Sequence, residues 1–177
     1  MIFEFDRETA ISALLYIAQR VKEPSYHPVV KVMYFADLCH LERYGRMIFG
    51  GDYRAYEYGP VPHQVYGMLM AAERKPNKIS NEAPFQITRH GNRKMINALA
   101  DPDLDRLSES ELECLDEAIA NWGNEDFGVR TQASHGPVWQ KAWDTKRNSP
   151  MPLEDIVMTL DGGAQLLEHL QNPHSWR

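Results

Sequence analysis

The segment from Pro28 to Gly45 constrains the fold most, because its apolar residues occupy almost every side of a helix. A helix of this kind is stable only when other elements surround it, so the sequence predicts a bundle built around it. Pro28 suits a first helical turn, and Gly45 is typical of the position just after a helix end. The polar residues Lys31, Asp37 and His40 on this helix should therefore find buried partners.

The remaining segments predict more helices and a small amount of β structure. Ser108 with Glu111 forms a capping box, and Asp6 is a plausible N-cap. We expect helices over about 7–22, from Pro60 or Pro62 onward, over 108–122, in short turns within 124–134 and 136–144, and in the tail over 152–160 and 163–171. A Gly-Gly turn at 50–51 and the alternating residues 84–91 predict short strands, with 84–91 pairing with 48–56. The predicted fold class is mainly α: a compact helical bundle forming one domain over residues 1–177, with a short β-hairpin or small β-sheet inserted after the second helix.

Length and composition agree with one globular unit, since 177 residues are enough to bury a core. No apolar run approaches the roughly 20 residues of a membrane span, and the acidic N-terminal stretch does not resemble a signal peptide. The two cysteines and seven histidines lack metal-ligand spacing. We therefore expect a cytoplasmic protein with no membrane association, no metal and no cofactor.

Charge is divided unequally along the chain. Residues 1–100 carry 13 Lys/Arg and 10 Asp/Glu, whereas residues 101–177 carry 6 and 15. The stretch 101–117, "DPDLDRLSESELECLDE", holds much of the excess of acid and would repel phosphate, so nucleic acid is not expected as the main ligand. A solvated helix face is the favoured interpretation of this stretch, and a docking face for a basic protein is the alternative.

Motifs of catalysis are missing from the sequence. It contains no phosphate-binding loop, no zinc-binding HExxH and no nucleophile elbow. Ser134 and His135 are adjacent, but sequence neighbours on a helix do not face each other as a nucleophile and its base. An enzyme is therefore not expected, and a small hydrolase using Ser134, His135 and the His40 region is an alternative.

The stretch "DYRAYEYGPVPHQVY", residues 52–66, places four tyrosines around a Gly-Pro-Val-Pro corner. Its alternation resembles a strand with two faces, and Val61 is expected to fill the core. We favour a packed structural joint, although Tyr and Arg are also enriched at protein interfaces. Lys31, Asp37, His40 and Arg43 are expected to form a buried polar cluster against this corner, which fixes the packing or lines a pocket.

Several segments in order resemble the Panacea domain family over about residues 10–145. A Lys-x-x-Tyr helix, a Tyr-Gly pair, an Asp-x-x-Ala segment and a Gly-Pro-Val corner come first, and "LSESELECLD" and "ASHGPVWQKAW" look like the second half. Residues 148–177 have no match. The family-motif positions, structural or binding, are Lys31, Tyr34, His40, Tyr44, Gly45, Asp52, Ala55, Tyr58, Gly59, Pro60, Val61, Tyr66, Ser134, His135 and Trp139.

The resemblance implies a binding protein. Members of this family are antitoxins of bacterial and phage toxin–antitoxin pairs, and a related Soc-type member is a proteolytic adaptor that delivers its toxin to a AAA+ protease. The implied function is binding and neutralising a cognate protein toxin, by direct occlusion or as an adaptor for its proteolysis. The candidate partner-binding residues are Arg54, Tyr56, Asp101, Asp103, Asp105, Glu109 and Glu113, together with the unmatched C-terminal segment.

A DNA-binding regulator is the first alternative, because antitoxins often repress their own promoters. Its support is the short basic stretch "RHGNRK", residues 89–94, since no helix is clearly basic.

Overall fold

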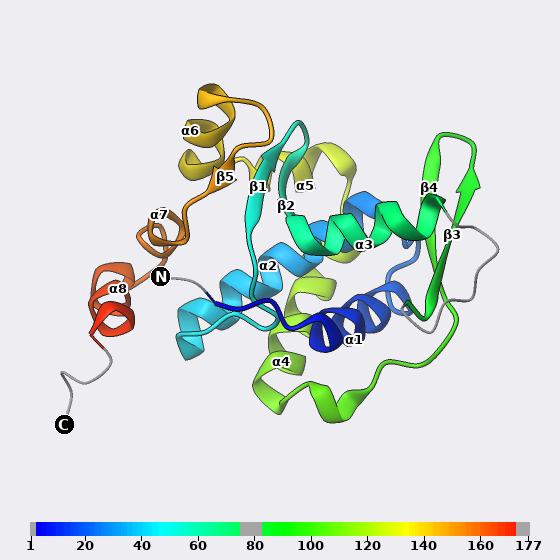
Figure 1. Cartoon of the computed structure of the whole chain (residues 1–177), viewed down its shortest axis with the longest axis horizontal. Coiled ribbons are helices and arrows are strands. Elements are labelled where there is room, and N and C mark those ends of the chain that lie inside the picture. Colours follow the sequence, from blue (N-terminus) through cyan, green and yellow to red (C-terminus); the bar gives the residue numbers. More distant parts are fainter. Residues whose placement is uncertain (1–2, 75–82, 173–177) are drawn as a thin grey trace.

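The computed structural model describes residues 3–74 and 83–172, and most of these residues lie in helices (Figure 1). The helices are α1 (Arg7–Ala18), α2 (Tyr26–Tyr44), α3 (His63–Arg74), α4 (Glu109–Ala118), α5 (Phe127–Ser134), α6 (Pro137–Thr145), α7 (Leu153–Val157) and α8 (Gly163–Gln171). The strands are β1 (Tyr53–Tyr56), β2 (Gly59–Pro62), β3 (Phe85–His90), β4 (Arg93–Ala98) and β5 (Pro150–Met151). The fold is compact and mainly α with small antiparallel sheets, so the predicted fold class is confirmed.

Helix α2 lies at the centre of the molecule, as its apolar composition predicted (Figure 1). One side of α2 contributes Val29, Val32 and Met33 to a large hydrophobic cluster with α1, α3, α4 and the β3–β4 hairpin. Tyr34 and Leu41 belong to a second cluster, which we call the α6–α8 cluster because α6, β5, α7 and α8 supply most of its other residues. Helix α2 is therefore buried from two sides, which explains its weak amphipathic character.

Strand β1 is the middle strand of a three-stranded sheet in the order β2-β1-β5. The predicted location of Pro60 and Pro62 in a helix is wrong, since both lie in β2 and α3 begins at His63. Pro60 is opposite Ala55, whose N–H donates to Ser149 and whose carbonyl accepts from Asn148 on the β5 side. Because β2 is an edge strand, a proline there removes no hydrogen bond that the sheet needs.

The predicted partner of the β3 segment is also wrong. Strand β3 pairs with β4 in a hairpin that places His90 opposite Arg93, and the two residues between them form the turn. Gly91 has a φ of +61°, as the favoured two-residue hairpin turns require. The alternation in 84–91 predicts β3, but no comparable pattern predicts the second strand, β4, after the Gly-Asn turn.

The N-terminal ends of the first and fourth helices follow their predicted caps. The carboxylate of Asp6 accepts from the N–H groups of Glu8 and Thr9, and Ser108 with Glu111 forms the complete capping box. Helix α1 ends at Ala18, earlier than the proline-based prediction, whereas α4 continues through a π-helical turn, η2 (Ile119–Gly123).

Candidate functional site

Residues from both halves of the predicted family motif converge at the Gly59-Pro60 corner. The buried Nζ of Lys31 in α2 donates to the carbonyl oxygen of Pro60 at 2.6 Å. Gly59 has a φ of +104°, and a Cβ atom there would lie 2.3 Å from Oγ of Ser134 and 2.9 Å from Nζ of Lys31. The corner thus requires glycine for its backbone and for the close approach of two polar side chains.

Ser134 and His135 do not act on each other in this structure. Oγ of Ser134 donates to the carbonyl of Thr131, and the ring of His135 stacks on Trp139 with centroids 3.6 Å apart. Trp139 in turn donates its indole N–H to the carbonyl of Tyr56 in β1. The geometry joins α5 and α6 to the sheet and contains no nucleophile–base hydrogen bond between these two residues.

A second polar layer beside the corner was missed by the sequence reasoning. Nε of Arg130 donates to Nδ1 of His27 at 3.1 Å, so the proton of the neutral imidazole lies on Nε2, which is 3.1 Å from the hydroxyl of Thr131. Arg130 also donates through Nη1 to the carbonyls of Trp122 and Glu125 near the end of η2. The signal for this layer was an arginine within the short amphipathic segment "NEDFGVR", following a helix end.

Burial and mutual repulsion lower the pKa of the basic groups at this place. Desolvation, with Lys31 and Arg130 as the next causes, lowers the pKa of His27 to about 3. Desolvation and then the charge of Arg130 lower the pKa of Lys31 to about 7, and desolvation with Lys31 nearby lowers the pKa of His135. The Arg130 guanidinium is therefore the dominant positive charge of this layer at neutral pH.

Aromatic side chains lie exposed directly outside the polar layer. Tyr58, at the β1–β2 turn, is 52% exposed, and Phe127, the first residue of α5, is 49% exposed. Their ring centroids lie 5.3 Å apart in an edge-to-face contact, and the ring centroid of His27 lies 4.2 Å from that of Phe127. Exposed rings in mutual contact are a feature of protein-binding surfaces.

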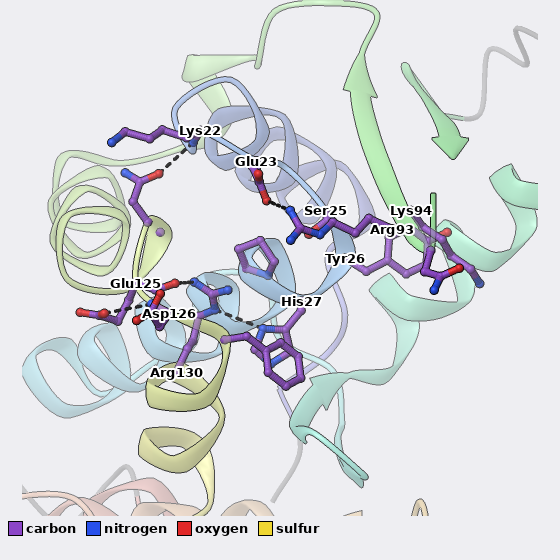
Figure 2. A pocket seen from close by; sticks show the side chains of 15 residues that line it. Lys22, Glu23, Ser25, Tyr26, His27, Arg93, Lys94, Glu125, Asp126 and Arg130 are labelled. Atoms are coloured by element: carbon purple, nitrogen blue, oxygen red, sulfur yellow. Dashed lines mark hydrogen bonds and ion pairs between the residues drawn. The ribbon is translucent and has the colours of Figure 1, made fainter. Parts of the chain in front are cut away.

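A pocket of about 760 Å³ opens next to Phe127 (Figure 2). It lies between the start of α2, the turn of the β3–β4 hairpin and the start of α5. Arg130 and His27, joined by their hydrogen bond, lie along one side of it in Figure 2. We call Tyr58, Phe127, His27, Arg130 and this pocket the α5 site. Its volume is typical of a ligand pocket or of a groove that receives a few side chains.

The predicted polar cluster of Lys31, Asp37, His40 and Arg43 at the corner is wrong as a cluster. Only Lys31 reaches the corner, because the other three project from different sides of α2. The carboxylate of Asp37 accepts from the N–H of Ile48 and from the hydroxyl of Tyr53, and desolvation raises its pKa to about 7. Lys31, Asp37 and His40 are buried and each finds a partner, as expected for buried polar groups, whereas Arg43 is exposed.

The motif residues near the end of α2 contact the loop after it and α4. Nδ1 of His40 donates to the carbonyl of Arg46, and Ser110 donates to Nε2. The ring of Tyr44 lies against His40, and its hydroxyl donates to Glu113, which also pairs with Arg43. These contacts join α2 to α4.

The other motif positions are mainly packed within the fold. Tyr34 contacts Tyr53 in the α6–α8 cluster, and burial raises the pKa of Tyr34 to about 12. Tyr66 contacts the rings of Tyr26 and Tyr56. The remaining positions are Gly45, which ends α2 with a φ of +71°; Asp52, which exchanges hydrogen bonds with Gln64 in α3; and Ala55 and Val61, which are buried.

The five candidate partner-binding acids, Asp101, Asp103, Asp105, Glu109 and Glu113, are all exposed. Asp103 caps the short 3-10 helix η1 (Leu104–Arg106) and pairs with Arg106, and Asp101 accepts from Gln19. Arg54 and Tyr56 lie half-buried in β1, on the face that also contacts Tyr66 and Asn148.

The basic stretch 89–94 lies in the β3–β4 hairpin. Arg89 and Lys94 pair with Glu73 of α3, and Arg93 pairs with Glu23. These carboxylates reduce the positive potential that binding to nucleic acid would require.

Comparison with known proteins gives one family. A family model described as "Antitoxin SocA-like, Panacea domain" matches residues 29–140. No curated protein and no solved structure matches the chain. The matched region runs from α2 into α6 and contains the Gly59-Pro60 corner and α5. Within the described residues, no helix is long and apolar enough to cross a bilayer.

Proposed function

Because the chain belongs to the SocA-like antitoxin family with the Panacea domain, we propose that it binds and neutralises a cognate protein toxin. The family match over residues 29–140 is the observation that carries this proposal. Neutralisation occurs by direct occlusion of the toxin or by its delivery to a AAA+ protease. In either route the chain acts by binding in the cytoplasm and makes or breaks no covalent bond.

Two structural observations support a binding role. Ser134 and His135 are each held by other partners, which leaves the hydrolase alternative without a nucleophile–base pair at these residues. The exposed contact between Tyr58 and Phe127 has the residue types that dominate protein interfaces. The cations Arg89, Arg93 and Lys94 are paired with carboxylates, which does not favour DNA binding at 89–94.

Co-expression with the neighbouring open reading frame tests the proposal. The chain is tagged, copurified with the product of that reading frame and analysed by size exclusion, while growth is scored with each gene alone and with both. We expect growth arrest by the neighbour alone, rescue by the pair and a stoichiometric complex. Rescue without a stable complex, together with a longer toxin half-life in protease-deficient cells, would identify the adaptor route. Absence of both rescue and complex would refute the proposal.

A further inference from the structure

Three hydrogen bonds donated by the guanidinium of Arg130 to other residues of the chain hold it in place. Its Nε and Nη1 atoms donate to His27 and to the carbonyls of Trp122 and Glu125. Arg130 is 6% exposed and forms no ion pair within the described residues, although the charges of the neighbouring Glu125 and Asp126 act on it. Buried charges are normally paired. A buried guanidinium that forms no ion pair within its own chain can therefore still form one with an acceptor from a binding partner.

The remaining nitrogen, Nη2, is open to the pocket. No described residue accepts a hydrogen bond from it. The buried polar side-chain atoms without a partner in the described part of the chain belong to Arg54, His63 and His135, so Nη2 is in contact with solvent. Because the rest of the guanidinium is fixed, Nη2 is a donor that needs no reorganisation when it meets a ligand.

The other charged groups of the pocket leave this donor available. Lys22, Arg93 and Lys94 line the pocket together with Glu23, Glu125 and Asp126. Arg93 pairs with Glu23 and Lys94 with Glu73, whereas one carboxylate oxygen of Glu125 accepts from the N–H of Asp126. Glu125 and Asp126 are exposed to solvent, so water screens their repulsion of an incoming anion more than it screens the buried Arg130.

Resting on the proposed function, we infer that the α5 site receives an acidic side chain of the protein partner. Nη2 of Arg130 donates to its carboxylate, and the rings of Phe127 and Tyr58 cover apolar groups beside it. His27 is neutral, since its Nδ1 accepts a hydrogen bond from Arg130, and its imidazole ring packs against the ring of Phe127. The arrangement combines a desolvated charge-assisted hydrogen bond with aromatic anchors, as interface hot spots do.

A titration with small molecules tests the carboxylate preference without any toxin. The full-length ¹⁵N-labelled protein is titrated with phenylacetate and with the uncharged phenylacetamide. We expect phenylacetate to shift the amide signals of Phe127, Gly128 and Arg130 and to bind at least about tenfold more tightly, as one charged hydrogen bond predicts. Equal binding of acid and amide, or shifts confined to other regions, would overturn the inference.

Variants then test the surface against the toxin. Phe127→Ala should weaken binding of the neighbour-encoded toxin at least about tenfold, since truncating an aromatic anchor has this effect. Leu99→Ala is the matched control, because Leu99 has the same exposed fraction of 49% and lies just after β4. Arg130→Lys keeps the charge but loses the forked geometry, and it should weaken both phenylacetate and toxin. Full toxin binding by Phe127→Ala would exclude this surface while leaving the antitoxin function intact. Failure of the wild-type chain to bind the toxin would refute the function, and the titration would still decide on the pocket.

Discussion

The Nζ atom of Lys31 lies 2.6 Å from the carbonyl oxygen of Pro60, and this hydrogen bond joins the N-terminal half of α2 to strand β2. Arg130, His27 and His135 face the same place, and all three are basic. A lysine in such surroundings is most stable without its proton, because neither solvent nor a carboxylate compensates the charge.

Lys31→Met should therefore change how stability depends on pH. The pKa of Lys31 is about 7 in the folded chain and near its ordinary 10.5 when unfolded. Between these values the unfolded chain binds more protons, so the wild-type free energy of unfolding gains a contribution that rises with pH. Urea denaturation at about pH 7 and about pH 9.5 should show a smaller rise in the variant. Lys146→Met, at an exposed position, is the control, and equal slopes in wild type and Lys31→Met would contradict the assignment.

Asp37→Asn should change the slope in the opposite direction at lower pH. The pKa of Asp37 is raised from 3.8 to about 7, mainly by burial, so the folded chain binds more protons between these values. This group makes the free energy of unfolding fall as pH rises from about 4 to about 7. Subtracting the variant's free energy of unfolding from that of the wild type at each pH isolates the contribution of Asp37. His27 is present in both proteins, and its lowered pKa makes the free energy of unfolding rise with pH instead. If the two proteins have parallel stability curves over this range, Asp37 is ionised in the fold.

Gly59→Ala should destabilise the chain by more than about 2 kcal/mol, because a side chain there is strained and collides with Ser134 and Lys31. Gly67→Ala is the matched control. Gly67 lies in α3 with open space around its Cβ position, so the change should be neutral or stabilise by up to about 1 kcal/mol. Thermal and urea unfolding measure both variants, and similar results for the two would show that the corner is more permissive than its geometry implies.

The two cysteines should form a disulfide under mild oxidation. Cys39 in α2 and Cys114 in α4 are both free thiols, and each is close enough to the other to affect its pKa. Burial raises the pKa of both, so the reaction with hydrogen peroxide should be slow and should accelerate at alkaline pH. Each disulfide formed removes two hydrogens and reduces peroxide to water, which intact mass spectrometry detects. Cys39→Ser is the control, and its oxidation to an intramolecular disulfide is impossible.

The tail should contribute to the stability of the whole chain. Ile156 in α7 is buried in the α6–α8 cluster with Tyr34 and Leu41 of α2. Ile156→Ala should cost about 2–4 kcal/mol, whereas Met158→Ala at a 54% exposed position should stay within about 0.5 kcal/mol of wild type. A small effect at Ile156, measured by denaturant unfolding, would mean that the tail folds separately.

Local patterns were sufficient to predict most of the helices, but not strands β2 and β4. The caps at Asp6 and Ser108 and the all-round apolar helix α2 follow from rules that act within a few residues. The pairing of β3 and the strand location of Pro60 depended on which segments meet in space, and short patterns do not contain this information.

The α5 site likewise combines features that local sequence predicts with features that depend on contacts between distant segments. The rings of the corner were recognised as a group, but their exposure depends on α5, which lies about seventy residues further along the chain. His27 and Arg130 are separated by 103 residues, and each has an unremarkable local context. Their partnership is a product of the tertiary fold alone.

Because α2 is covered from two sides, its two faces become buried at different times during synthesis. The buried residues of the large cluster end at Ala118 and its partly buried ones at Trp122, whereas the α6–α8 cluster is completed only by residues around Ile156 and Leu170. The residues of the large cluster therefore leave the ribosome well before those of the α6–α8 cluster. In the interval, the face of α2 with Tyr34 and Leu41 is exposed to solvent on the nascent chain. Nascent-chain chaperones should bind that apolar face. A stalled or truncated message should yield a chain that lacks the α6–α8 cluster and is prone to aggregation.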